Sequence, residues 1–314
     1  MDRRTFLGAS LGAFATTLVA REAAGLRRIG FLREGCPPIV DGLVRAMRDV
    51  GLIEGHNITF VGNCSDKADD LPGLAMDLVR QRTDLIFTGG TGATLAAKEA
   101  TSDIPIVFFV GGNPVERGVV ASMRRPGGNL TGFAQGLYDE KQLQILKTAI
   151  PAVSRVAYAA VPGVSRENMV SVDAARNLGV EIEHVPVDDL DDFVSFFATV
   201  KKAGIEAALI PDVPRLTPRL SRIGIEASRS RLPTIGFRRI YAESGGLMSY
   251  APMVSEAYGR LAIQVDKVLR GAKPADLPVE QPTRFELVIN LKEAKALGLS
   301  IPRLVRLGAD ELIQ

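Results

Sequence analysis

Residues 84–94 read Asp84-Leu85-Ile86-Phe87-Thr88-Gly89-Gly90-Thr91-Gly92-Ala93-Thr94, a short apolar run that leads into a glycine-rich turn. An uninterrupted apolar run of this length is typical of a strand that is buried on both faces, as in a parallel sheet. The glycines predict a strand-to-helix turn, and a second apolar run follows at residues 104–109. Apolar strands separated by helical segments indicate an α/β fold.

The same alternation continues on both sides of this unit. In the first part of the chain we expect further strands at 28–32, 57–61 and 130–133, and amphipathic helices at 41–50 and 71–81. The pattern restarts near residue 140. Helices are then expected at 140–149, 167–178, 191–203 and 216–228, and strands at 155–159, 180–185, 207–210 and 234–237. The sequence therefore predicts two similar α/β lobes, each built on a doubly wound parallel sheet.

Composition and motifs argue against several classes of function. The net charge of +2 is too small to indicate a nucleic-acid partner. His56 and His184 lie far apart and outside any metal-ligand motif, so we expect no metal. The turn after Thr88 is not a P-loop, because no Gly-Lys-Ser/Thr follows, and it is not a dinucleotide fingerprint, because Leu95 stands where a third glycine is needed. No nucleophile motif is present, and no cofactor is expected.

The N-terminus has the layout of an export signal. Arg3 and Arg4 precede Phe6-Leu7 and an uncharged run of small residues from Gly8 to Ala20. This is the pattern of a bacterial twin-arginine signal, with Ala20 and Ala24 as candidate cleavage points. The alternative is an ordinary N-terminal helix. We expect residues 1–24 to engage the twin-arginine export machinery and the mature protein to be soluble in the periplasm.

The two cysteines, Cys36 and Cys64, follow the first two expected strands. If those strands are neighbours in a parallel sheet, both cysteines lie near the same edge. A disulfide between them fits an oxidising compartment. The alternative is a pair of small buried thiols.

Ligands of open α/β sheets bind beyond the carboxyl ends of the strands. The loops expected there are residues 33–37, 89–94, 111–115 and 134–136 in the first lobe, and 161–165, 211–214 and 237–239 in the second. Two lobes that face each other with these edges would enclose a cleft for a small molecule. The turn at 89–94 could bind an anion through its amides, or have only a conformational role. Residues 111–115 could approach a ligand, or form a tight turn before a helix with Pro114 at its first position.

Several segments resemble a known family. Residues 105–115, 125–132, 245–250, 271–283 and 285–299 are similar to the substrate-binding components of ABC transporters of the tryptophan/tyrosine-binding-like type. The resemblance covers nearly all of the mature chain. It implies a type I periplasmic-binding-protein fold, with two lobes joined by three crossings and a ligand cleft between them. It also implies an ABC permease as partner, and amino acids, aromatic ones among them, as ligands.

The resemblance also implies how the chain divides. Lobe one would comprise residues 25–136 and about 250–277, and lobe two residues 137–249 and about 278–314. The chain departs from the family pattern at Arg33-Glu34, where the first loop is commonly small and polar, and at Asn113, where the family usually has aspartate. These departures change the charges expected in the cleft.

We therefore expect a periplasmic solute-binding protein, a monomer without enzymatic activity, that closes on an amino acid or related carboxylate and delivers it to an ABC permease. Asp212 is the candidate partner for an ammonium group and Arg239 for a carboxylate. The amides near Gly90 and Gly112 are further candidates for a carboxylate. The full set of expected ligand-binding residues is Glu34, Gly90, Thr91, Gly112, Asn113, Gln135, Val164, Ser165, Asp212, Arg239 and Tyr250. The alternatives are an exported enzyme on a doubly wound fold and a periplasmic ligand-sensing module.

Overall fold

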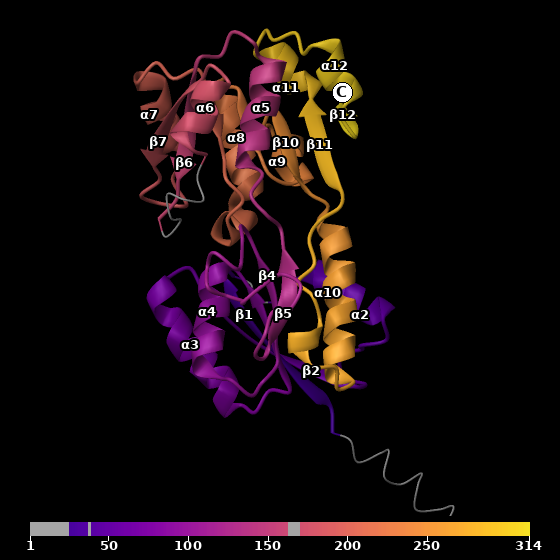
Figure 1. Cartoon of the computed structure of the whole chain (residues 1–314). Coiled ribbons are helices and arrows are strands. Elements are labelled where there is room, and N and C mark those ends of the chain that lie inside the picture. Colours follow the sequence, from indigo (N-terminus) through magenta and orange to yellow (C-terminus); the bar gives the residue numbers. More distant parts are fainter. Residues whose placement is uncertain (1–24, 37–38, 163–169) are drawn as a thin grey trace, which may run out of the picture.

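The computed structural model describes residues 25–36, 39–162 and 170–314, which form two α/β lobes stacked end to end (Figure 1). The expected export signal, and the expected ligand-binding residues Val164 and Ser165, lie outside the described residues. In the part of the chain that is described, no helix is long and apolar enough to span a membrane.

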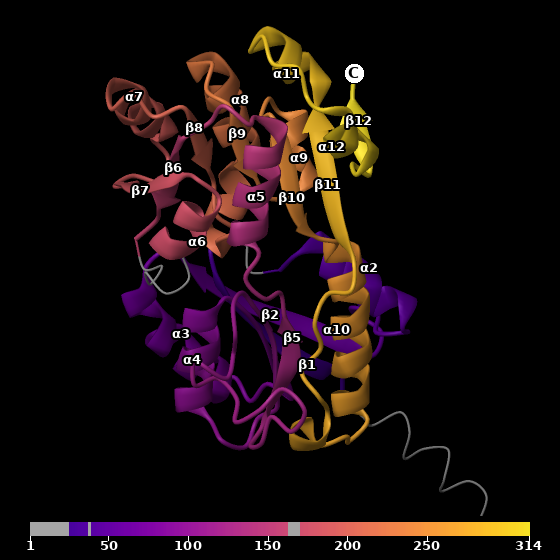
Figure 2. The same ribbon diagram turned by 45° about the horizontal axis from the view of Figure 1, so that its top comes forward.

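Lobe one is built on a five-stranded parallel sheet in the order β2-β1-β3-β4-β5. The strands are β1 (Arg27–Glu34), β2 (Ile58–Ser65), β3 (Leu85–Gly89), β4 (Ile106–Val110) and β5 (Leu130–Ala134). One face is covered by α2 (Asp41–Asp49) and α10 (Val254–Leu269). The other face is covered by α3 (Leu71–Arg80) and α4 (Thr91–Ala100) (Figure 2). The inner strands β3 and β4 are therefore buried on both sides, which explains their apolar sequences, whereas the edge strand β2 is only half-buried.

Lobe two is built on a seven-stranded sheet in the order β12-β11-β10-β9-β8-β6-β7. Its strands are β6 (Arg155–Ala160), β7 (Glu181–Pro186), β8 (Ala207–Leu209), β9 (Thr234–Gly236), β10 (Met248–Pro252), β11 (Phe285–Asn290) and β12 (Glu311–Ile313). One face carries α7 (Phe193–Lys202), α8 (Leu220–Ser230) and α9 (Arg239–Glu243). The other carries α5 (Asp139–Ala149), α6 (Val172–Asn177), α11 (Leu291–Ala296) and α12 (Arg303–Leu307).

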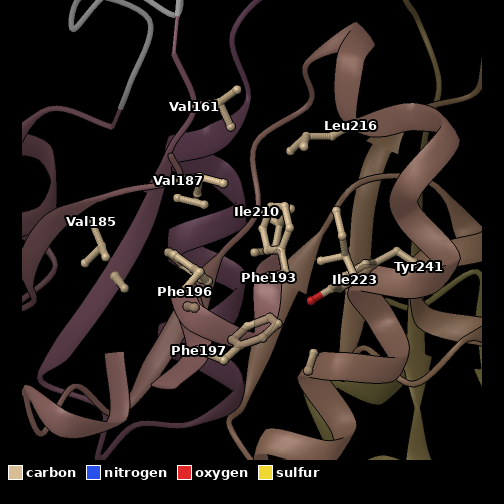
Figure 3. Packing of buried hydrophobic residues seen from close by; sticks show 14 of the residues in the cluster. Val161, Val185, Val187, Phe193, Phe196, Phe197, Ile210, Leu216, Ile223 and Tyr241 are labelled. Carbon is tan, nitrogen blue, oxygen red and sulfur yellow. The ribbon is translucent and has the colours of Figure 1, made fainter. Parts of the chain in front are cut away.

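The core of lobe two is centred on three phenylalanines of α7. Phe193, Phe196 and Phe197 contact one another and pack against apolar side chains of β7 and β8 and of α8 (Figure 3). The spacing of these rings places all three on one side of the helix, the side that faces the sheet. Asp192 caps the same helix, because its carboxylate accepts from the N–H of Ser195 at 3.1 Å.

The chain passes between the lobes three times within the described residues: between β5 and α5, between β10 and α10, and between the short helix η4 (Pro274–Asp276) and β11. The expected divisions near 250 and 277 differ from the observed ones by a few residues. Tyr250 is a strand residue of the lobe-two sheet. Glu280 still belongs to lobe one, since its N–H donates to the carbonyl of Gly132 beside β5.

One strand runs against the predicted direction. β11 is antiparallel to β10, whereas an all-parallel sheet was expected. The path of the chain explains this: β10 ends at the edge that faces lobe one, the chain builds α10 there, and it re-enters lobe two at that same edge. A strand that starts where its neighbour ends has to run the opposite way.

The helix expected at 216–228 also begins later than predicted. Residues Pro214–Arg219 form a 3₁₀ helix, η3, and the α-helix starts at Leu220. Pro218 has no N–H to donate, and its ring would clash with the preceding turn of an α-helix, so the α-helix begins only after it.

Candidate functional site

A cavity of about 350 Å³ lies between the lobes, at the carboxyl ends of strands from both sheets. Lobe one contributes the segments that follow β1 to β5, and lobe two those that follow β8 and β9. The volume is in the range of small-molecule sites. Aromatic and aliphatic side chains form much of the wall, among them Phe87, Phe109, Tyr138, Tyr158 and Tyr258.

The structure brings six of the expected residues together in the lining of this cavity. They are Glu34, Gly90, Thr91, Gly112, Gln135 and Asp212. Three others lie elsewhere. Asn113 is exposed and closes a turn, accepting from the N–H of Val115 at 3.0 Å and donating to Glu116 at 2.7 Å. Tyr250 stacks on Phe285 in the lobe-two sheet, and Arg239 points away from the cleft.

The carboxylate of Glu34 caps helix α4 from a distance of 58 residues in sequence. Its Oε1 accepts from the N–H of Gly92 at 2.5 Å and of Ala93 at 3.3 Å. The N–H groups at a helix N-terminus favour an anion, and here the protein's own carboxylate fills that position.

The N–H groups of Gly90 and Gly112, expected to lie near a ligand carboxylate, are hydrogen-bonded within the protein in this structure. The N–H of Gly90 donates to the carbonyl of Phe109 at 2.9 Å, and the N–H of Gly112 donates to that of Gly136 at 3.2 Å. Both glycines have positive φ, at 102° and 70°, so they serve the turn geometry that makes these bonds. These two amides therefore contribute to the conformation of the turns in this structure.

Asp212 of lobe two is bonded to the first crossing. Its Oδ2 accepts from the hydroxyl of Tyr138 at 2.5 Å and from Nε2 of Gln135 at 3.2 Å. Burial raises the pKa of the Tyr138 hydroxyl well above its ordinary value, and the charge of Asp212 raises it further. Tyr138 is therefore a fixed donor that joins the crossing to the β8 loop.

Asp139 lies next along the chain and is also buried in the cavity wall. It accepts a hydrogen bond from the hydroxyl of Tyr158 at 2.6 Å. Burial raises its pKa from 3.8 to about 7; the bond from Tyr158 opposes the rise, and the charge of Asp212 adds to it. A carboxyl group in this position is close to half protonated at neutral pH.

Arg239 does not face the cleft, contrary to expectation, and its neighbour Arg238 does. Arg239 donates to Glu286 at 2.8 Å and also pairs with Glu243 and Glu311 on the flank of lobe two. Arg238 stands at the N-terminus of α9 with φ 59° and ψ 141°, and its Nε atom is buried. Adjacent side chains after a strand point in different directions, so a shift of one residue exchanges a cavity arginine for a surface arginine.

Contacts cross the mouth of the cleft as well. Arg219 of lobe two reaches the carboxylate of Asp66 in lobe one at 3.3 Å and that of Asp191 in its own lobe at 2.9 Å. Arg215 donates to the backbone carbonyl of Asp66 at 3.2 Å. The two lobes are therefore in contact in this conformation.

Several lining residues were missed in the sequence. Arg33 was noted only as a departure from the family pattern, and Ser65, Asp66 and Tyr258 were not considered. The carboxyl-end rule points to Ser65 and Asp66, because Ser65 is the last residue of β2 and Asp66 follows it. No comparable signal exists for Tyr258, which lies on α10 and reaches the cavity only after the chain has returned from lobe two.

The disulfide is present in the structure. Cys36 and Cys64 are bonded, with their Cα atoms 5.4 Å apart. β1 and β2 are paired in parallel so that Arg33 lies beside Cys64 and Glu34 beside Ser65. The bond therefore holds the segment that carries Arg33 and Glu34 against the neighbouring strand.

Comparison with known proteins agrees with this architecture. Residues 33–313 match the family model described as ABC transporter substrate binding protein. A tyrosine-binding protein of Clostridioides difficile (strain R20291) is 27% identical over 285 residues, which cover 86% of this chain and 78% of that protein.

Solved structures show the same fold. An ABC domain from Streptococcus pneumonia in complex with L-Trp superposes with a TM-score of 0.80 at 23% identity, over 92% of this chain and 100% of that one. A conserved domain protein from Vibrio cholerae gives 0.81 at 23% identity, over 91% and 99%. The two lobes and three crossings are those of a type I periplasmic-binding-protein fold. With a family model matched over nearly the whole described chain, the protein belongs to the family of ABC transporter substrate-binding proteins.

Proposed function

We propose that this protein is an exported solute-binding protein that encloses a small organic carboxylate, an amino acid or a related acid, and delivers it to an ABC permease in the inner membrane. No bond of the ligand is made or broken. The observation that carries the proposal is the cavity of about 350 Å³ lined by strand ends of both lobes. A ligand held by both walls stabilises the closed arrangement, because only that arrangement supplies both sets of contacts.

The proposal includes an export pathway and a cellular compartment. The twin-arginine pattern at Arg3-Arg4 supports export by the twin-arginine machinery to the periplasm, where the mature chain acts as a monomer. The disulfide between Cys36 and Cys64 supports an oxidising compartment. The names of similar proteins, which bind tyrosine and L-Trp, support amino acids and their relatives as the first ligands to test.

The experiment is a thermal-shift screen of residues 25–314, followed by calorimetry. The protein is unfolded and refolded first, so that ligand retained from the host is removed. The panel contains amino acids, their deaminated acids, other small carboxylates, purines and sugars. A ligand at about a hundred times its dissociation constant stabilises the fold by about 2.7 kcal/mol, and we expect this for at least one carboxylate. A folded protein that binds no member of the panel would contradict the proposal.

A further inference from the structure

The cavity contains charges of both signs, and they are not equally available to a ligand. Four carboxyl groups line it, those of Glu34, Asp66, Asp139 and Asp212. Each accepts from a partner within the protein: Glu34 from amides of α4, Asp66 from Arg219, Asp139 from Tyr158, and Asp212 from Tyr138 and Gln135. A ligand ammonium group would have to share a carboxylate that already has a donor.

Arg238 has a hydrogen bond with the hydroxyl of Tyr258, but one of its donors has no partner among the described residues. Its guanidinium lines the cavity from lobe two, and its buried Nε has no hydrogen-bond partner among the described residues. A buried donor without a partner is costly, and more so when it carries charge. Burial acts against the charged form of Arg238, but Asp212 and the hydroxyl of Tyr258 outweigh it and raise its pKa, so the group stays a cation.

Arg33 lines the same cavity from lobe one. The side chain of Arg33 lies against the backbone of Gly89. A Cβ atom added to Gly89 would lie 2.9 Å from Cγ of Arg33. Burial lowers the pKa of Arg33; Tyr258 partly offsets this, and the positive charge of Arg238 adds to it. The two cations line the same cavity, Arg33 from lobe one and Arg238 from lobe two. Arginine nonetheless stays protonated in proteins.

The alternative anion site in lobe one is closed. A Cβ atom on Gly90 or Gly92 would stand 2.7 or 2.8 Å from Oε1 of Glu34, so this carboxylate lies directly on the turn. A ligand carboxylate at the same helix N-terminus would meet both the bulk and the charge of Glu34.

We propose that the ligand is a net anionic organic acid with an apolar body, whose carboxylate binds between Arg238 and Arg33 and whose recognition needs no amino group. The guanidinium fork of Arg238 can donate two parallel hydrogen bonds to a carboxylate. The negative charge removes the repulsion between the two arginines, and therefore favours the approach of the lobes. The aromatic wall formed by Phe87, Phe109 and Tyr158 receives the apolar body.

This inference rests on the proposed function and goes further, since it separates an acid from the corresponding amino acid. The test uses matched pairs in calorimetry: 3-phenylpropionate with phenylalanine, 3-(4-hydroxyphenyl)propionate with tyrosine, and 4-methylpentanoate with leucine. Phenethylamine supplies the body of phenylalanine with an ammonium group alone. We expect at least one acid to bind ten times or more tightly than its amino acid, and phenethylamine not to bind.

Variants locate the carboxylate. Arg238→Gln and Arg33→Gln are each expected to weaken binding of the best acid by tenfold or more, and Arg238→Lys, which keeps the charge but loses the fork, by less than Arg238→Gln. Arg239→Gln is the matched control, because it removes the same charge from the next residue outside the cavity; we expect unchanged affinity. Circular dichroism and melting curves check that each variant is folded.

The outcomes are distinguishable. An amino acid that binds as tightly as its deaminated acid, or no binding by any of the three acids, overturns the inference. Equal loss in Arg238→Gln and Arg239→Gln also overturns it. If an amino acid binds as tightly as its deaminated acid, the proposed function stands, because an amino acid is then bound. The proposed function fails only when the wider panel gives no ligand.

Discussion

The guanidinium of Arg219 lies 3.3 Å from the carboxylate of Asp66, and the two residues belong to different lobes. Arg219 is largely buried and is also held by Asp191, so it is already oriented toward its partner across the cleft. This ion pair exists only while the lobes are together. It therefore stabilises the arrangement in which the two lobes are in contact.

From this we predict that Asp66→Asn weakens ligand binding by a factor of about 1.4 to 5, since a partly exposed pair contributes about 0.2–1 kcal/mol. Calorimetry with the ligand found by the screen measures the affinity, and small-angle scattering measures the mean separation of the lobes. Asp173→Asn is the control, because it breaks an exposed pair with Arg176 inside lobe two. Equal effects of the two variants would remove the special role of Asp66.

The pH dependence of stability should reveal Asp139. Its pKa is about 7 in the folded protein and 3.8 ordinarily, so the folded state keeps a proton that the unfolded chain releases between about pH 4 and 7. The contribution of this group to stability is therefore present below pH 4 and lost as the pH rises to 7 and above. The loss is on the order of 2–4 kcal/mol.

Asp139→Asn removes this titration and leaves an oxygen to accept from Tyr158. We compare the free energy of unfolding of the variant with that of the natural protein at each pH. We expect this difference to change in favour of the variant by about 2–4 kcal/mol as the pH is raised from 4.5 to 8. Urea unfolding at both pH values gives the difference. A relative stability that is the same at both would show that Asp139 is not the titrating group.

Tyr138 and Tyr250 offer a matched pair of hydroxyl deletions. Tyr138→Phe removes the 2.5 Å bond to Asp212 and is expected to destabilise the protein by about 1–3 kcal/mol, because it leaves a partly buried carboxylate short of a donor. Tyr250→Phe keeps the stacking on Phe285 and removes a hydroxyl without a hydrogen bond among the described residues. Its expected cost is below about 0.5 kcal/mol. Equal costs in urea unfolding would refute the assignment.

The disulfide should be a major source of stability. Cys36 and Cys64 are 28 residues apart, and closing a loop of that length stabilises the fold by about 3–4 kcal/mol. We expect dithiothreitol, or Cys36→Ser with Cys64→Ser, to lower the free energy of unfolding by about 2–4 kcal/mol. The double variant itself should not respond to dithiothreitol. A natural protein equally stable with and without the reductant would contradict the prediction.

The strands and helices up to residue 236 could be predicted because their signals are local. Buried parallel strands are uninterrupted apolar runs, and the helices between them show a clear period. The direction of β11 is not local, since it depends on the excursion of the chain through α10.

The cavity lies at strand ends that were expected from the sequence, but the contacts of individual side chains were not expected. Glu34 was expected at the cleft, yet its use as a cap depends on where α4 lies 58 residues later. Arg239 was chosen instead of Arg238 because a sequence does not show which of two adjacent arginines turns inward when the first adopts a positive φ. Tyr258 reaches the cavity only through tertiary packing, because it lies on α10.

The position of helix α10 affects how the chain folds during synthesis. Leu261 and Val265 of this helix cover the sheet of lobe one beside Phe87 and Val107, although some 150 residues separate them in the chain. During synthesis the amino-terminal half therefore leaves the ribosome with one apolar face of its sheet only partly covered. A fragment ending near residue 137 would expose that face, because it lacks the part of the lobe-one core that α10 supplies. The protein gains its full stability only after its last quarter has been made.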